Sequence, residues 1–86
     1  MSETARGDKL GEWGHGGSQL TLYRYRLQWR PGDFTRPVII PLESVRSVAV
    51  GPLGGDLVIV AGGETYRIFL GDQTDKARAA IVAVLP

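Results

Sequence analysis

Residues 39–50 contain the feature that most constrains how this chain can fold: a proline, Pro41, between two apolar runs. Proline has no N–H to donate to a neighbouring strand, so a central strand does not continue through it. The sequence therefore predicts a strand that ends at Pro41-Leu42, a single turn over residues 43–45, and a new strand that begins near Arg46.

Alternating apolar and polar residues predict about five strands, joined by turns that are rich in glycine. The pair Gly62-Gly63 is typical of a two-residue hairpin turn. The near-continuous apolar run 57–60 is expected of a strand covered on both faces. The predicted strands span residues 20–30, 36–42, 46–50, 56–61 and 64–70, and in the last of them Thr65, Arg67 and Phe69 fall on the face opposite to Tyr66, Ile68 and Leu70.

Residues 20–30 combine two alternating patterns that differ in phase. Leu20 and Leu22 have one parity, whereas the aromatic residues and Leu27 have the other. Because a shift of one residue moves every side chain to the opposite face, we expect a bulge or bend near residues 22–23. No glycine or asparagine lies there to form a tight hairpin, so the prediction is one long, bent strand. Its two faces are Tyr23, Tyr25, Leu27 and Trp29 on one side and Arg24, Arg26, Gln28 and Arg30 on the other.

The end of the chain predicts one amphipathic helix. Asp72 is a favourable N-cap residue, and apolar residues then recur at helical spacing. The predicted apolar face is Ala77, Ala80, Ile81, Val84 and Leu85. The predicted fold class is therefore mainly β (α+β): a small antiparallel sheet or partial barrel of about five strands with one C-terminal helix.

Residues 1–18 contain five glycines and few large apolar residues, which predicts a flexible arm ahead of a folded domain at residues 19–86. Trp13 is the one residue of this arm that we expect to dock on the domain. His15 is interpreted as part of a loose terminus and not as a ligand.

Length and composition argue against several classes of function. A chain of 86 residues with 43% hydrophobic residues is expected to form one globular domain. The chain has no cysteine and one histidine, so we expect no disulfide, no metal and no cofactor. No serine has a companion histidine in the domain, and no pattern brings two carboxylates together, so we do not expect an enzyme.

The location and source of the protein are inferred from composition alone. No apolar run is long enough to span a membrane, and residues 1–17 have no apolar core typical of a signal peptide. A cytoplasmic location is therefore expected. Eight arginines against two lysines are typical of a GC-rich bacterial or phage genome.

The order of the expected elements follows a recognisable pattern between residues 20 and 85. It comprises a strand through Arg26-Leu27, a glycine-containing turn, the segment IPLESVRSV at residues 40–48, two glycine-linked strands and an amphipathic helix. This pattern resembles the bacterial pleckstrin-homology-like (PH-like) family. The fold of that family has two nearly orthogonal sheets with seven strands and a capping helix, so five strands imply a reduced version. The resemblance implies binding and scaffolding roles, some with assembly into oligomers, and no catalytic residues.

The leading functional hypothesis is a non-enzymatic protein-interaction or scaffolding module that self-associates. A reduced sheet leaves unpaired N–H and C=O groups along an edge, where another chain can pair. The expected partner is a second copy or another protein, bound through this edge or through the aromatic face. The opposing interpretation is that the N-terminal arm covers the edge, with Trp13 as the plug. The expected partner-binding residues are Trp13, Tyr23, Tyr25 and Trp29.

The alternative function is an anionic-ligand-binding module. Arginines present planar groups that suit phosphate or carboxylate, and beside aromatic residues they bind a lipid headgroup or single-stranded nucleic acid. The opposing interpretation is a solvated sheet face whose charges are balanced by nearby carboxylates, which the net charge of +1 favours. The residues expected for the anionic site are Arg24, Arg26, Arg30 and Arg46.

Overall fold

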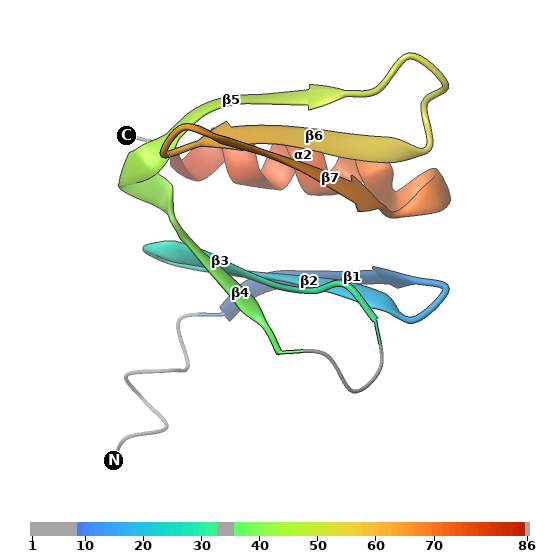
Figure 1. Ribbon diagram of the computed structural model, residues 1–86, viewed down its shortest axis with the longest axis horizontal. Helices are drawn as coiled ribbons and strands as arrows, with labels where there is room; N and C mark the ends of the chain where they lie inside the picture. Colours follow the sequence, from blue (N-terminus) through green and yellow to red (C-terminus); the bar gives the residue numbers. More distant parts are fainter. Residues whose placement is uncertain (1–8, 33–35, 86) are drawn as a thin grey trace.

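The computed structural model describes residues 9–32 and 36–85, which form two antiparallel sheets and one α-helix (Figure 1). The strand order is β1-β2-β3-β4 in the four-stranded sheet and β5-β6-β7 in the three-stranded sheet. The mainly-β fold class with a C-terminal helix is thus confirmed. The elements are β1 (Lys9–His15), β2 (Ser18–Tyr23), β3 (Arg26–Arg30), β4 (Val38–Pro41), the 3-10 turn η1 (Leu42–Ser44), β5 (Val45–Val50), β6 (Asp56–Ala61), β7 (Glu64–Phe69), the 3-10 turn η2 (Gly71–Gln73) and α2 (Thr74–Val84).

The described residues contain seven strands instead of the predicted five, and part of the difference lies in the predicted arm. Residues 9–15 form β1, which pairs with β2 and places Trp13 opposite Leu20. The turn between them uses Gly16 and Gly17, whose φ angles of 57° and 88° suit a two-residue hairpin. The prediction of a flexible arm is therefore wrong for residues 9–17. Residues 1–8 lie outside the described residues.

The single bent strand predicted at residues 20–30 is also wrong. The chain reverses direction over Arg24-Tyr25, so β2 and β3 form a hairpin in which Leu22 lies opposite Leu27. This turn produces the change of phase that the sequence showed, because both leucines then point into the core. The hairpin forms without glycine or asparagine, and the burial of Leu22 and Leu27 stabilises it instead.

The proline segment folds as predicted. Strand β4 ends at Pro41, η1 covers the next three residues, and β5 begins at Val45. The Ser44 hydroxyl donates a hydrogen bond to the Pro41 carbonyl at 2.7 Å, which holds the turn closed. This turn carries the chain from the four-stranded sheet to the three-stranded sheet (Figure 1).

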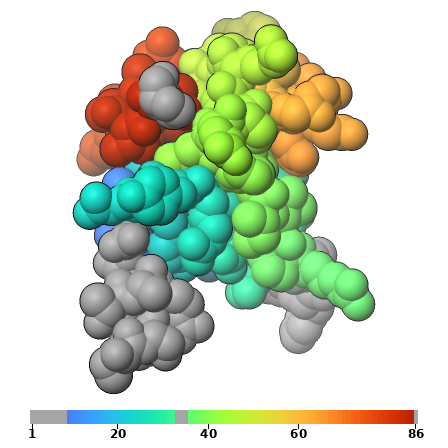
Figure 2. Space-filling view, turned by 90° about the vertical axis from the view of Figure 1, so that its left-hand side faces the viewer, coloured from blue at the N-terminus to red at the C-terminus, as the bar shows by residue number. Residues whose placement is uncertain are grey.

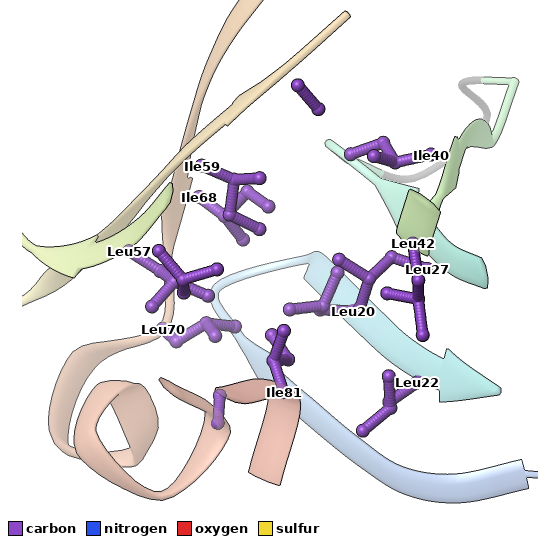
Figure 3. Packing of buried hydrophobic residues seen from close by; sticks show 13 residues of the cluster. Leu20, Leu22, Leu27, Ile40, Leu42, Leu57, Ile59, Ile68, Leu70 and Ile81 are labelled. Atoms are coloured by element: carbon purple, nitrogen blue, oxygen red, sulfur yellow. The ribbon is translucent and has the colours of Figure 1, made fainter. Parts of the chain in front are cut away.

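The core lies between the two sheets and is closed on one side by α2. Figure 3 shows Leu20 and Leu27 of the four-stranded sheet pointing into the same space as Ile59 and Ile68 of the other sheet, with Ile81 of α2 beside them. The prediction that β6 is covered on both faces is wrong. Its inward residues are buried, whereas its outward valines are only half-buried.

The helical face was predicted correctly, but the start of the helix was not. Ala77 and Ile81 are buried, and Ala80, Val84 and Leu85 pack against the core. Asp72 lies within η2 and not at the N-cap of α2, and no side chain caps the helix. Instead, the buried Thr74 hydroxyl donates to the Gly71 carbonyl at 2.7 Å, so a 3-10 turn leads into the helix.

Candidate docking surfaces

One groove lies where the end of α2 meets the β2–β3 turn and η1; we call it the helix-end groove. Figure 2 looks at this end of the molecule, with α2 in red, the β2–β3 turn in cyan and η1 in yellow-green. The groove has a volume of about 710 Å³ and a mainly apolar lining. Its lining residues are Leu10, Arg24, Tyr25, Leu42, Glu43 and Val84.

The helix-end groove is built on a fixed backbone. The Leu42 amide donates to the Tyr25 carbonyl at 3.0 Å, which ties η1 to the β2–β3 turn. Leu42 is buried and forms the floor, whereas the Tyr25 side chain is 74% exposed at the mouth. An exposed aromatic ring held beside an apolar floor is typical of a surface that binds another protein.

A second groove, which we call the loop groove, lies between the β5–β6 loop and the end of β7. It has a volume of about 490 Å³ and is lined by Leu53, Gly55, Asp56, Arg67 and Phe69. Leu53 is 97% exposed and Phe69 is 56% exposed. The Arg67 Nε lies 3.5 Å from Asp56 Oδ2, so the two charges at this groove face each other.

Phe69 is also in contact with the histidine of the β1–β2 hairpin. The His15 and Phe69 rings meet edge to face with their centroids 5.3 Å apart. His15 therefore lies at an ordered hairpin end and not in a loose terminus.

The outer face of the four-stranded sheet is polar. The Lys9 Nζ donates to Glu12 Oε1 at 2.8 Å, and Gln19 donates to the other oxygen of the same carboxylate. The hydrogen bond from Lys9 and the negative charge of Glu12 raise the pKa of the exposed Lys9 above its ordinary value. A shallow polar hollow of about 200 Å³ lies between Glu12 and Arg30 on this face.

The four aromatic residues predicted to bind a partner do not share a face. Trp13 and Trp29 pack against the core, Tyr23 lies on the outer face of the four-stranded sheet, and Tyr25 lies in the β2–β3 turn. The reason is the hairpin at residues 24–25. Even-numbered residues point into the core in β2, whereas odd-numbered residues do so in β3, so residues of one parity lie on opposite faces of the sheet. Trp13 is a residue of β1 and not a plug on a sheet edge. Of the four, Tyr25 lines the helix-end groove.

Two contacts hold the half-buried Trp29 against the core. Its Nε1 donates to the Ser18 hydroxyl oxygen at 3.1 Å, and its ring meets Tyr66 of β7 edge to face at a centroid distance of 6.1 Å. The Ser18 contact lies within the four-stranded sheet, whereas the Tyr66 contact links the two sheets. We therefore interpret Trp29 as a structural residue that lies close to the surface.

The four arginines predicted to form an anionic site are likewise separated. Arg26 and Arg30 lie on the outer face of the four-stranded sheet, Arg24 lines the helix-end groove, and Arg46 lies on β5 of the other sheet. The Arg26 guanidinium carbon lies 4.2 Å from the centre of the Tyr23 ring, a cation–π contact. The expected continuous row is therefore reduced to two residues.

The sequence pattern did not single out the apolar residues of the two grooves. Leu10 was assigned to the arm, Leu53 to a turn, and Val84 to the core face of the helix. The available signal was Phe69, which alternates with buried residues and so had to face outward. A large apolar residue on an outward face is the feature that could have predicted the loop groove.

Comparison with known proteins adds no relative: no family model, no curated protein and no solved structure matches this chain. Among the described residues, no helix is both long and apolar enough to cross a membrane.

Proposed function

We propose that this chain is a non-enzymatic protein-interaction module that self-associates. The observation that carries the proposal is the clustering of exposed apolar side chains. Leu10 and Tyr25 meet at the helix-end groove, and Leu53 and Phe69 meet at the loop groove. Single exposed apolar residues are normal on a protein surface, whereas clusters in hollows indicate binding surfaces.

The polar side chains support a binding role more than a catalytic one. Glu12 faces Lys9, and Asp56 faces Arg67, so each of these carboxylates is already paired with a cation. Within residues 9–32 and 36–85, no three His, Asp or Glu side chains gather in one place. General acid–base catalysis needs titrating groups held together with separated pKa values.

Membership of the PH-like family belongs to the same proposal. Two sheets with seven strands in all and a C-terminal helix agree with the number of sheets and strands that the resemblance implies, and they support a complete rather than a reduced version. The proposed scaffolding role follows from that membership. The cytoplasmic location and the bacterial or phage origin stay predictions from the sequence.

The direct test of self-association is light scattering coupled to size-exclusion chromatography over a wide range of protein concentration. We expect the weight-average mass to rise above the monomer mass as concentration increases. A constant monomer mass throughout the range contradicts the proposal.

The alternative, an anionic-ligand-binding module, is supported only by Arg26 and Arg30, which share the outer face of the four-stranded sheet. Its test is a titration with anionic lipid vesicles and with a single-stranded oligonucleotide, each at two salt concentrations. Binding through these arginines would weaken with salt and would be lost in the double variant Arg26→Glu, Arg30→Glu. Binding that is absent at low salt eliminates this function.

A further inference from the structure

The two sheets of the described residues have four edge strands, and β4 is an edge that prolines protect. The Leu42 amide donates towards β3, and successive residues of a strand alternate in direction. The backbone groups of residues 37, 39 and 41 therefore point away from the sheet. Two of these three residues, Pro37 and Pro41, have no N–H to offer another strand.

Strands β1 and β5 are protected in a different way, by irregular pairing and by α2. The register of β1 shifts between Lys9 and Gly11, and that of β5 shifts between Val45 and Ser47. Such bulges twist an edge away from regular pairing.

Two side chains, one from η2 and one from α2, also form hydrogen bonds with the outward backbone groups of these edges. The amide of Gly14 in β1 donates to Gln73 Oε1 at 3.1 Å. The carbonyl of Val48 in β5 accepts from Arg78 Nε at 3.2 Å. A second strand would have to displace these contacts to pair with either edge.

Among the described residues, strand β7 is protected by none of these three features: proline, a register shift or a side-chain hydrogen bond to its outward backbone. It pairs with β6 over six consecutive residues without a register shift, and it contains no proline. The Asp56 carbonyl accepts from Gly51 at 2.8 Å, on the β5 side. The residue opposite Asp56, which is Phe69, therefore directs its N–H and C=O away from β6, and so do Arg67 and Thr65 by alternation. In the described part of the chain, no hydrogen bond reaches these outward groups.

The charge on this edge does not oppose pairing. Arg67 is the charged member of the three outward residues, and its guanidinium reaches Asp56 of the neighbouring strand β6, where Nε lies 3.5 Å from Oδ2. Proteins often block an edge strand with a charge that projects over it. Here the charge leans away from the edge and is balanced within the same chain.

We propose that β7 pairs with β7 of a second copy, antiparallel and across a two-fold axis, so that the two three-stranded sheets become one continuous six-stranded sheet. This inference rests on the proposed self-association and names the surface responsible. An antiparallel pair of identical strands is self-complementary, as a two-fold interface requires. Thr65 of each copy lies opposite Phe69 of the other, and the two Arg67 residues lie opposite each other. Because each Arg67 is paired with its own Asp56, a second copy brings a balanced charge to the axis.

The same position tests backbone and side chain separately. Arg67→Pro removes the outward N–H at the centre of the interface, and we expect the dimer dissociation constant to rise by roughly 30-fold or more, since each copy loses a hydrogen bond. Arg67→Thr keeps the N–H and removes a charge that Asp56 already balances, so we expect the dimer dissociation constant to stay within about threefold of its original value. Sedimentation equilibrium from about 10 μM to about 1 mM, the range of a weak interface, measures both constants.

A second variant covers the case in which Arg67→Pro does not fold, as judged by circular dichroism. Thr65→Lys adds a projecting charge to the β7 edge and should weaken the dimer by at least about tenfold. The matched control is Ser47→Lys, which adds the same charge to an exposed residue of the β5 edge and should leave the dimer unchanged.

Hydrogen exchange gives a measurement that needs no substitution. We expect the amides of Thr65, Arg67 and Phe69 to exchange more slowly as protein concentration rises. The amide of Ile39, which points outward on β4, serves as the control and should not respond.

The outcomes separate this inference from the proposed function. Loss of the dimer in Arg67→Pro or Thr65→Lys, with the control unaffected, supports both. A dimer whose dissociation constant is unchanged in these variants overturns the β7 interface and leaves self-association standing. A monomer at every concentration overturns both.

Discussion

The two edges of the three-stranded sheet differ in what covers them, although both belong to strands of six residues. Strand β5 has a register shift near its start, and Arg78 of α2 donates to its outward Val48 carbonyl. Strand β7 is regular along its length, and its outward groups have no hydrogen bond among the described residues. In this sheet, α2 covers the β5 edge through Arg78 and leaves the β7 edge open, so the position of the helix distinguishes the two edges.

The largest expected effect comes from loosening the helix that closes the β5 edge. Ile81→Ala removes a fully buried side chain of α2 and should lower the free energy of unfolding by about 2–5 kcal/mol. Val82→Ala is the matched control, since Val82 follows in the same helix and is 46% exposed. Urea denaturation measures both. Equal losses in the two variants would show that α2 does not pack on the core through Ile81.

The next effect tests which backbone groups of β7 point outward. Tyr66→Pro removes an N–H that bonds to β6, whereas Arg67→Pro removes one that points to solvent in the monomer. We expect the first substitution to cost roughly 2–3 kcal/mol more than the second, because a buried ladder carbonyl then loses its partner. Thermal denaturation of the dilute proteins provides the comparison. A greater cost for Arg67→Pro would reverse the assigned orientation of the strand.

A smaller effect is expected where a side chain bonds the β5 edge directly. Arg78→Met keeps the apolar stem and removes the donor to the Val48 carbonyl, so the free energy of unfolding should fall by about 1 kcal/mol. Lys76→Met removes the same charge from an exposed position of the same helix and should change stability by less than about 0.5 kcal/mol. If both variants unfold at the same urea concentration, the Arg78 contact does not stabilise the edge.

The smallest effect concerns the Lys9–Glu12 pair on β1, which lies at the surface. Because Glu12 raises the pKa of Lys9, its stabilising contribution is present below the ordinary lysine pKa and disappears as pH rises through the raised value. An NMR titration of Lys9 should show the raised pKa, and Glu12→Gln should return it towards normal. A Lys9 pKa that does not respond to Glu12→Gln contradicts this pairing.

The predictions that succeeded depended on local chemistry. Pro41 marked the end of β4 because a missing N–H acts at one residue, and the two glycines at residues 62–63 marked a hairpin because positive φ favours glycine. The apolar spacing in residues 77–85 indicated the buried face of α2 for a similar reason, since helical geometry alone places these residues together.

The predictions that failed depended on contacts between distant residues. Strand β1 has little intrinsic preference for a strand, and it is held by Trp13 against the core and by pairing with β2. The β2–β3 turn contains no typical turn residue, because burial of Leu22 and Leu27 determines it. Because the sequence analysis missed this turn, it assigned the aromatic and arginine residues of residues 20–30 to the wrong faces of the sheet.

The amino-acid sequence by itself determined the fold class, the break at Pro41, the C-terminal helix and the alternation that turns Phe69 outward, since each follows from the geometry of a few neighbouring residues. Only the tertiary structure decided which edges are covered and which apolar residues meet in a groove. Those properties depend on where α2 and the β2–β3 turn pack, and packing is set by burial summed over both sheets and not by any single segment.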